Sequence, residues 1–316
     1  MAGALKELRD RITTVQATQK ITSAMRMVAA AKLRQARLRV DQGRWHQKFL
    51  NQLLGRFVMN LESCDHPPEL LVGRGYNSTV APQVVHPFYH DDNLRHSPHQ
   101  SGLLILISGD RGLCGSYNTR LIAAARQWIA TYQDTGGDFS VICVGRKMTE
   151  VLTRDYANYI VNNYTQAELL ARGPGYEMEP VAENILNLYA DSKYEVADII
   201  YTKFINVMQS DVVRVPLVPL TRCVQPEFLK EKSIYTFEPG LDEILPSFVP
   251  DYLNLCLRDA FIESIASEQA ARMTAMENAT RNAEEMVGKL RLEYNQTRQS
   301  TITRELIEII SGAEVL

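Results

Sequence analysis

The sequence predicts an α/β domain flanked by two long helices, one at each end, that pair as an antiparallel coiled coil. Three observations support this fold class. Each end of the chain has a long stretch without proline in which apolar residues recur with helical spacing. The middle of the chain instead alternates short apolar runs with amphipathic segments. That alternation is typical of an open, Rossmann-like α/β sheet.

The N-terminal coiled-coil helix is expected to span residues 1–63. No glycine or proline occurs between Ala4 and Gln42. A stripe with steps of three and four residues runs along this helix and becomes polar near its middle. Because polar residues weaken a purely structural seam, we expect part of this helix to contact something besides its partner helix. The stripe consists of Leu5, Leu8, Ile12, Val15, Gln19, Thr22, Arg26, Ala29, Leu33, Ala36 and Val40.

Charge distinguishes the two ends of the chain. Residues 17–38 carry five basic side chains and no acidic one. Residues 1–50 hold eleven Lys and Arg against three Asp and Glu, whereas residues 251–316 hold seven against eleven. Opposite charge balances favour antiparallel pairing, with cross-helix charge pairs worth roughly a few tenths of a kcal/mol each. The alternative is two separate, solvated helices.

The C-terminal coiled-coil helix is expected to span residues 251–316, after a linker at 223–250 that contains four prolines. About 60 helical residues extend roughly 90 Å, which is more than one compact domain can cover. The helix must therefore protrude or run beside a partner helix. Its stripe consists of Leu253, Leu257, Phe261, Ile265, Gln269, Met273, Met276, Thr280, Ala283, Val287, Leu290, Tyr294 and Thr297.

The α/β domain is expected to span residues 101–222. A stretch rich in Pro, Gly, Asn and Asp precedes it at 64–100 and predicts a long surface loop or insertion. The last two strands form an antiparallel hairpin, and the prolines of VPLVPL place the final strand at a sheet edge. Strands are predicted at 101–110, 139–145, 159–164, 196–205 and 212–220, and helices at 120–132, 147–156 and 180–191.

The most enzyme-like stretch is ISGDRGLCGSYN, residues 107–118, where a strand enters a glycine-rich turn and a helix leaves it. Gly109, Gly112 and Gly115 could expose backbone N–H groups to a phosphate. Their spacing matches neither the dinucleotide fingerprint nor the P-loop. Cys114 could act as a nucleophile only beside a base. A tight strand-to-helix turn with a small buried thiol is the favoured interpretation.

Metal binding is a second alternative. The loop at 64–100 contains His86, His90, Asp91, Asp92, His96 and His99, which are suitable ligand types, but their spacing fits no standard motif. Five scattered cysteines without a C-x-x-C pair argue against a disulfide framework or a zinc site. No apolar run reaches the length of a spanning helix, and no export peptide is visible at the N-terminus.

Five motifs, in order along nearly the whole chain, resemble the gamma subunit of F-type ATP synthases. They are QKITSAMRMVAAAKLR (19–34), SGDRGLCGSYN (108–118), YTKFIN (201–206), SEQAARMTAMENATRNAEEM (267–286) and YNQTRQSTITRELIEIISGAE (294–314). The resemblance implies a non-catalytic rotor shaft whose paired helices enter a hexameric ATPase head. Ion flow through a membrane ring of c subunits would turn this shaft and change the conformation of the catalytic beta subunits.

The resemblance also implies partners and contact residues. The partners are the alpha and beta subunits, an epsilon-type subunit and the c ring, with no cofactor, metal or nucleic acid, and with the membrane reached only through the ring. The implied location is peripheral, on the cytoplasmic face of the bacterial inner membrane or the equivalent organellar membrane. Contacts with beta subunits fall on Lys20, Met25, Arg26, Lys32, Arg34, Arg298, Gln299, Thr303 and Glu305, and contacts of the foot segment SIYTFEP with the ring fall on Tyr235 and Glu238.

Two other functions compete with this one. The basic first helix could bind nucleic acid as a coiled coil, although the net charge of −3 and the lack of interleaved aromatic residues oppose it. The GDRGLCG turn could serve a nucleotide-dependent α/β enzyme. Two departures from the family pattern also stand out. The segment at 64–100 is long, and only Cys223 lies where chloroplast-type members carry a regulatory cysteine pair, which opposes a thiol switch.

Overall fold

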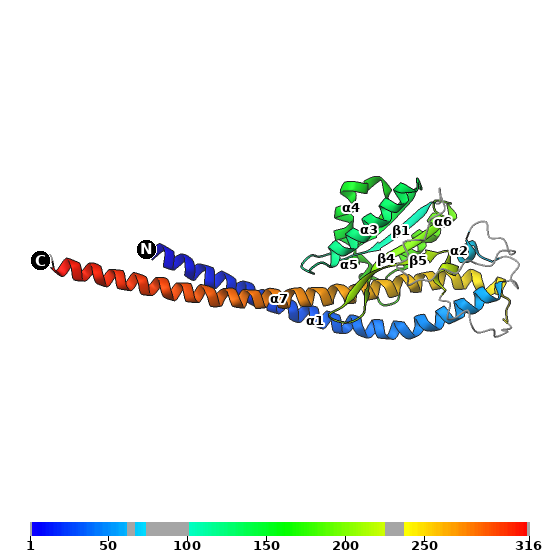
Figure 1. Cartoon of the computed structure of the whole chain (residues 1–316). Coiled ribbons are helices and arrows are strands. Elements are labelled where there is room, and N and C mark those ends of the chain that lie inside the picture. Colours follow the sequence, from blue (N-terminus) through cyan, green and yellow to red (C-terminus); the bar gives the residue numbers. More distant parts are fainter. Residues whose placement is uncertain (1, 62–66, 74–100, 225–236, 315–316) are drawn as a thin grey trace. The chain divides into compact units, whose positions relative to one another are not determined.

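The computed structural model of the chain describes residues 2–61, 67–73, 101–224 and 237–314 (Figure 1). The chain divides into two compact units, residues 1–31 with 272–316, and residues 32–271. Long terminal helices, α1 (Ala2–Met59) and α7 (Leu241–Glu314), contribute to both units. The predicted fold class is confirmed, since α1 and α7 are in contact and a five-stranded mixed sheet with helices lies between them in the sequence.

In the unit formed by residues 1–31 and 272–316, the two helices pack along the predicted seam. Every stripe residue from Leu5 to Ala29 on α1 and from Met273 to Thr297 on α7 is buried or half-buried. Thr22 is only 9% exposed, and its Oγ1 lies 2.8 Å from Oγ1 of Thr280. This polar seam position is therefore satisfied within the chain, so its polarity does not signal an outside contact as the sequence suggested.

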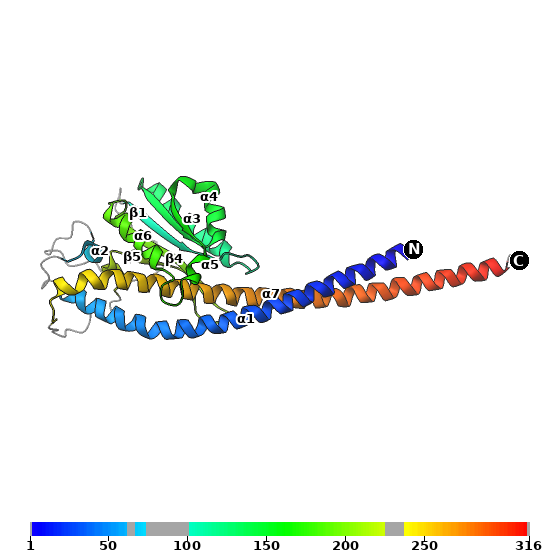
Figure 2. The ribbon, with the colours of Figure 1, turned by 180° about the vertical axis from the view of Figure 1, so that it is seen from behind.

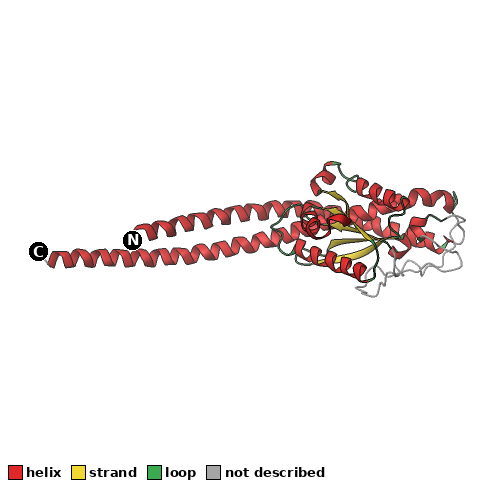
Figure 3. Cartoon of the chain, turned by 90° about the horizontal axis from the view of Figure 1, so that it is seen from above, coloured by secondary structure: helices red, strands yellow, loops and turns green. Residues whose placement is uncertain are grey.

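The unit formed by residues 32–271 contains the sheet, whose strands are yellow in Figure 3. The strand order is β3-β2-β1-β4-β5. The first four strands in this order are parallel, and β5 closes the sheet antiparallel to β4. The hairpin and the edge position of the proline-bearing strand are thus confirmed. The strands are β1 (Gly102–Ile107), β2 (Phe139–Val144), β3 (Ile160–Tyr164), β4 (Val196–Phe204) and β5 (Ser210–Val218).

Different helices cover the two faces of the sheet, as the opposite views of Figures 1 and 2 show. The face carrying Ile105 packs against α6 (Glu179–Ala190) and residues 253–261 of α7. The face carrying Leu104 and Leu106 packs against α3 (Tyr117–Asp134) and α4 (Arg146–Tyr156). Because successive strand residues alternate between faces, a strand covered on both sides must be apolar throughout, and all six residues of β1 are buried.

Helix α7 begins at Leu241, ten residues before the start that the prolines indicated. Pro246 and Pro250 both lie inside it. Considered alone, each proline favours a break in the helix, because proline lacks the backbone N–H that an interior helical position donates. The helix is stabilised by burial of residues spaced one turn apart, since Leu241, Leu245 and Val249 pack in a cluster with α1 residues that include Phe57.

Two short helices were not anticipated from the sequence. They are α2 (Glu69–Val72) and α5 (Gln166–Ala171). The second begins with a capping box, in which Thr165 and Glu168 each accept a hydrogen bond from the other's backbone N–H. Among the described helices, none has the length together with the apolarity needed to cross a bilayer.

Candidate functional site

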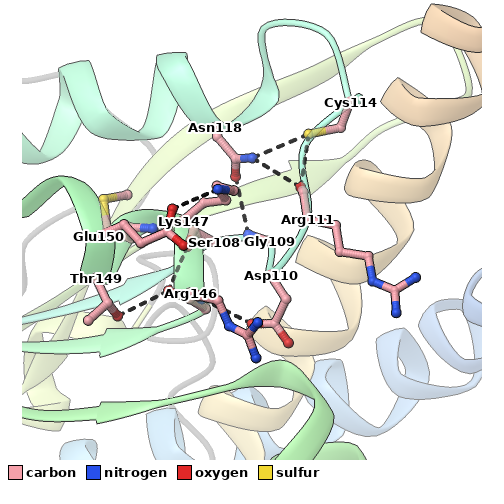
Figure 4. A network of polar contacts seen from close by, with 12 residues as sticks. Ser108, Gly109, Asp110, Arg111, Cys114, Asn118, Arg146, Lys147, Thr149 and Glu150 are labelled. Atoms are coloured by element: carbon pink, nitrogen blue, oxygen red, sulfur yellow. Dashed lines mark hydrogen bonds and ion pairs between the residues drawn. The ribbon is translucent and has the colours of Figure 1, made fainter.

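The glycine-rich turn after β1 lies where α/β proteins often bind phosphate, and here an aspartate occupies that place (Figure 4). The Asp110 carboxylate accepts hydrogen bonds from the backbone N–H groups of Arg146 at 3.0 Å, Gln166 at 3.1 Å and Ala167 at 3.1 Å. Arg146 opens α4, and Gln166 opens α5. A negatively charged group of the chain itself therefore satisfies the N-terminal donors of two helices.

The glycine that precedes Asp110 is required by packing. A Cβ at Gly109 would lie 2.9 Å from the carboxyl carbon of Glu268 on α7. That carboxylate is buried and accepts a hydrogen bond from Nε2 of Gln166 at 3.0 Å, and the same nitrogen donates to the carbonyl of Ser108 at 2.9 Å. Gly109 thus allows α7 to approach the turn, which explains this glycine without a bound phosphate.

Cys114 is buried in the same turn, with 1% of its surface exposed. Its thiol lies 3.7 Å from the carbonyl oxygen of Arg111 and 3.3 Å from Nδ2 of Asn118 (Figure 4). Neither a carbonyl nor an amide can take a proton from a thiol, so these contacts do not activate it. They match the interpretation of a tight strand-to-helix turn with a buried thiol.

The predicted contact residues on α1 are mostly exposed but do not share one face. Lys20, Lys32 and Arg34 are exposed, and Met25 is 41% exposed. Arg26 differs, because it lies on the seam and is half-buried. Residues seven apart share a helix face, so Met25 and Lys32 point the same way, whereas Lys20 lies on another face.

Large apolar side chains of α1 lie exposed beside the buried seam. The contact residues predicted from the sequence omit most of them. Ile21 is 58% exposed and Val28 is 56% exposed. With Met25 they form a stripe at steps of four and three residues, parallel to the buried seam, which we call the α1 outer stripe. Its spacing was visible in the sequence, although only the structure shows which of two neighbouring stripes is buried.

The predicted contact residues on α7, Arg298, Gln299, Thr303 and Glu305, are all exposed. They lie on two adjacent stripes that also carry exposed apolar residues. Arg298 and Glu305 share a face with Ile302, which is 49% exposed, whereas Gln299 and Thr303 line up with Leu306, which is 53% exposed. Thr303 also donates a hydrogen bond to the Gln299 carbonyl at 2.9 Å.

Other predicted positions fall partly outside the described residues. Glu238 is described and exposed. Tyr235, the other foot residue, lies outside the described residues, as do the six candidate ligands His86, His90, Asp91, Asp92, His96 and His99. Among the residues that are described, no group of three or more His, Cys, Asp or Glu side chains is placed to hold a metal ion.

Comparison with known proteins gives a consistent result over the full length of the chain. The family model described as ATP synthase matches residues 4–316. The ATP synthase gamma chain of Paramagnetospirillum magneticum is 36% identical over 319 residues, covering 99% of this chain and 100% of that protein. That of Methylobacterium nodulans is 37% identical over 319 residues, with the same coverage of both chains.

Two solved structures share the fold. A chain of the central stalk and c-ring of the Tetrahymena thermophila mitochondrial ATP synthase is 23% identical, with a TM-score of 0.56, covering 82% of this chain and 99% of that chain. A chain of the Euglena gracilis mitochondrial ATP synthase, from a structure of OSCP, F1 and c-ring, is 17% identical, with a TM-score of 0.61, covering 100% of this chain and 95% of that chain.

Proposed function

Because the chain belongs to the ATP synthase gamma-chain family, we propose that it conveys rotation to the catalytic beta subunits through the exposed faces of α1 and α7. As a gamma chain it is a non-catalytic subunit and the rotor of the central stalk. The observation that carries the proposal is the α1 outer stripe, where Ile21, Met25 and Val28 are exposed beside a buried seam. Apolar side chains this exposed are suited to sliding contact with a surrounding partner.

The proposed mechanism needs no catalytic group on this chain. A shaft whose faces differ presents different contacts to each of three catalytic sites and so favours a different conformation in each. This is a coupling free energy between shaft angle and site conformation, and it is reciprocal. Ion flow that turns the shaft would therefore promote ATP release, and hydrolysis would turn the shaft in the opposite direction.

The proposed contacts with acidic beta-subunit loops fall on the cationic residues Lys20, Lys32, Arg34 and Arg298, with Gln299, Thr303 and Glu305 as polar contacts and Met25 and Arg26 as further positions. Complementary charges across an interface determine the register of the two partners and their association rate more than their affinity. A double reversal, Lys20→Glu with Lys32→Glu, is expected to lower ATP hydrolysis by the assembled complex severalfold without dissociating it. Lys48→Glu, on an exposed α1 residue outside the proposed set, is the matched control. Equal activity in all three complexes would contradict the proposal.

Small residues near the centre of α1 fit a surface that must slide. Ala31 is exposed, whereas Ala29 is buried with 1% exposure. Ala31→Leu alone therefore enlarges the outer surface and is expected to slow turnover of the assembled complex. Ala29→Leu overpacks the seam and is expected to cost about 1–3 kcal/mol of stability. Unchanged synthesis and hydrolysis rates for Ala31→Leu would count against a sliding role.

The proposed partners are the alpha and beta subunits, an epsilon-type subunit and the c ring, which Tyr235 and Glu238 would touch. The proposed location is peripheral, on the cytoplasmic face of the bacterial inner membrane or its organellar equivalent. Affinity capture of the tagged full chain from a native membrane extract is expected to recover these subunits together. Recovery of nucleic acid, or of none of these subunits, would overturn the assignment.

A further inference from the structure

Two acidic side chains of α7 are buried where this helix meets α1. Asp259 and Glu263, one helical turn apart, are each 8% exposed. Oδ2 of Asp259 and Oε2 of Glu263 are buried without a hydrogen-bond partner among the described residues. A buried ionised carboxylate needs partners for its oxygens, so this environment favours the neutral, protonated form of both groups.

Helix α1 crosses these two carboxyls at a glycine. A Cβ at Gly43 would lie 3.0 Å from Oδ1 of Asp259 and 3.6 Å from its Cγ. A glycine inside a helix costs roughly 1 kcal/mol relative to alanine, and here an added Cβ would press on the Asp259 carboxyl. A cavity of about 10 Å³ remains between the helices, bordered by Gly43, Gln47, Asp259 and Glu263 among others. That volume suffices for about one water molecule.

Charged groups from three elements surround the pair. The Arg258 guanidinium lies 3.8 Å from Asp259, and Arg44 donates a hydrogen bond to the Phe204 carbonyl at 3.0 Å. Arg39 pairs with the buried Glu177, so its charge is already engaged. The titratable and charged groups that face the carboxyls are Arg39, Arg44 and His46 from α1, Arg258 and Cys256 from α7, and Tyr201 and Lys203 from β4.

We propose that Asp259 and Glu263 form a proton-operated joint between α1, α7 and β4, in which ionisation of the two carboxyls loosens the contact of α1 with α7 at Gly43. Two ionised carboxylates one turn apart on a helix repel each other. Their unpartnered oxygens would draw water into the cavity, or draw in Arg44 and Lys203, and either change widens the spacing at Gly43. The joint lies within residues 32–271, so it does not depend on the proposed contacts with other subunits.

The pKa values of the two groups place the transition near neutral pH. Burial raises the pKa of Asp259 to about 6, against the opposing effects of Arg258 and His46. Burial also raises the pKa of Glu263 to about 7, against the opposing effects of Lys203 and Arg44. Between about pH 4 and the folded pKa values, the unfolded chain ionises both groups while the folded chain keeps them protonated. Stability from this pair is therefore full below about pH 4, falls as pH rises to the folded pKa values, and is constant above them.

The test measures the thermal unfolding midpoint of the full chain between pH 4.5 and 8.5. The wild-type midpoint is expected to fall as pH rises to about 7.5, a range set by the two raised pKa values. The variant Asp259→Asn with Glu263→Gln removes both ionisations and is expected to flatten this fall and to exceed the wild type at pH 8. Glu284→Gln with Glu285→Gln, two exposed carboxyls of α7, should retain the wild-type slope. An unchanged slope in the first variant would overturn the proposal.

His46 lies close enough to Asp259 to lower the pKa of that carboxyl, so His46→Gln separates its contribution. Persistence of most of the slope in His46→Gln supports the carboxyl pair, and its loss there assigns the effect to the histidine and refutes the joint.

Amide hydrogen exchange of the wild-type chain gives a readout that needs no variant. After correction for the intrinsic pH dependence of exchange, residues 38–48 of α1 are expected to exchange at least about tenfold faster at pH 8 than at pH 5.5, the change that one pKa unit of coupling produces. Strand β1 reports global unfolding, so its exchange should accelerate no more than the fall in global stability requires, and less than that of residues 38–48. Equal behaviour of the two segments would also refute the joint.

Discussion

Helix α7 is packed in two contrasting ways along its length. Among residues 32–271, its positions 259–264 and 266–270 are all buried. In the unit formed by residues 1–31 and 272–316, only Ala283 and Val287 are buried between positions 277 and 289. The first stretch is enclosed by partners that come from distant parts of the sequence, whereas the second buries one narrow seam.

The contrast extends to polar groups. In the enclosed stretch, several buried polar side chains are held by hydrogen bonds to the α/β domain. Ser267 donates to the Thr202 carbonyl at 3.0 Å, and Oγ of Ser264 lies 2.6 Å from the Tyr117 hydroxyl. In the seam stretch, most polar side chains face outward. A long helix can therefore be anchored by polar contacts in one stretch, while in another stretch its outer faces make no contacts that stabilise the fold.

The largest effect that this comparison predicts concerns truncations of buried apolar side chains. Phe261 is fully buried in the enclosed stretch, so Phe261→Ala is expected to lower the free energy of unfolding by about 3–5 kcal/mol. Val287 is 7% exposed in the seam, so Val287→Ala is expected to cost about 1–2 kcal/mol. Urea unfolding of the full chain, followed by circular dichroism, measures both. Equal losses would mean that the two stretches are packed alike.

The same comparison explains what the sequence could predict. The seam residues from Leu5 to Ala29 and from Met273 to Thr297 were all identified, because a one-sided helix carries its own periodicity. The strands were identified because burial on both faces makes them apolar throughout. The start of α7 was placed too late, since the burial of Leu241 and Leu245 that stabilises the proline-containing turns involves distant residues.

The site residues also differ in how far the sequence could predict them. Exposure of Arg298 and Gln299 accords with the contact role that the family resemblance assigned, which stays a prediction. The role of Asp110 was not foreseeable from its local sequence, because its three donors are contributed by α4 and α5, which begin at residues 146 and 166. The carboxyls of Asp259 and Glu263 resemble ordinary polar positions of a helix until α1 is placed over them.

A second, smaller effect is expected at the turn after β1. Asp110→Ala leaves the N-terminal N–H groups of α4 and α5 without their acceptor and is expected to cost about 1–3 kcal/mol. Inorganic phosphate should partly restore the thermal midpoint of this variant and leave the wild type unchanged, because an anion can replace the lost carboxylate. Asp134→Ala, at an exposed position of α3, is the control and should change stability by less than about 0.5 kcal/mol. A loss no larger in Asp110→Ala than in the control would show that the carboxylate does not stabilise the two helices.

The smallest predicted effect concerns two glycines. Replacing each of them with alanine is expected to change the free energy of unfolding in opposite directions. Gly43 lies in α1 beneath Asp259, and a Cβ there would come 3.0 Å from Oδ1. Gly288 lies in the seam stretch of α7, is exposed, and has no heavy atom within 4 Å of the position its Cβ would take.

Both replacements with alanine improve helix propensity by up to about 1 kcal/mol. Gly288→Ala should therefore raise the free energy of unfolding, whereas Gly43→Ala should lower it, because the added methyl presses on the buried Asp259 carboxyl. Thermal unfolding at pH 5, where both carboxyls are protonated, isolates this steric effect from their ionisation. Stabilisation by both replacements would show that α1 has room to shift at Gly43, and that the enclosed part of the molecule is no more tightly packed there than the seam.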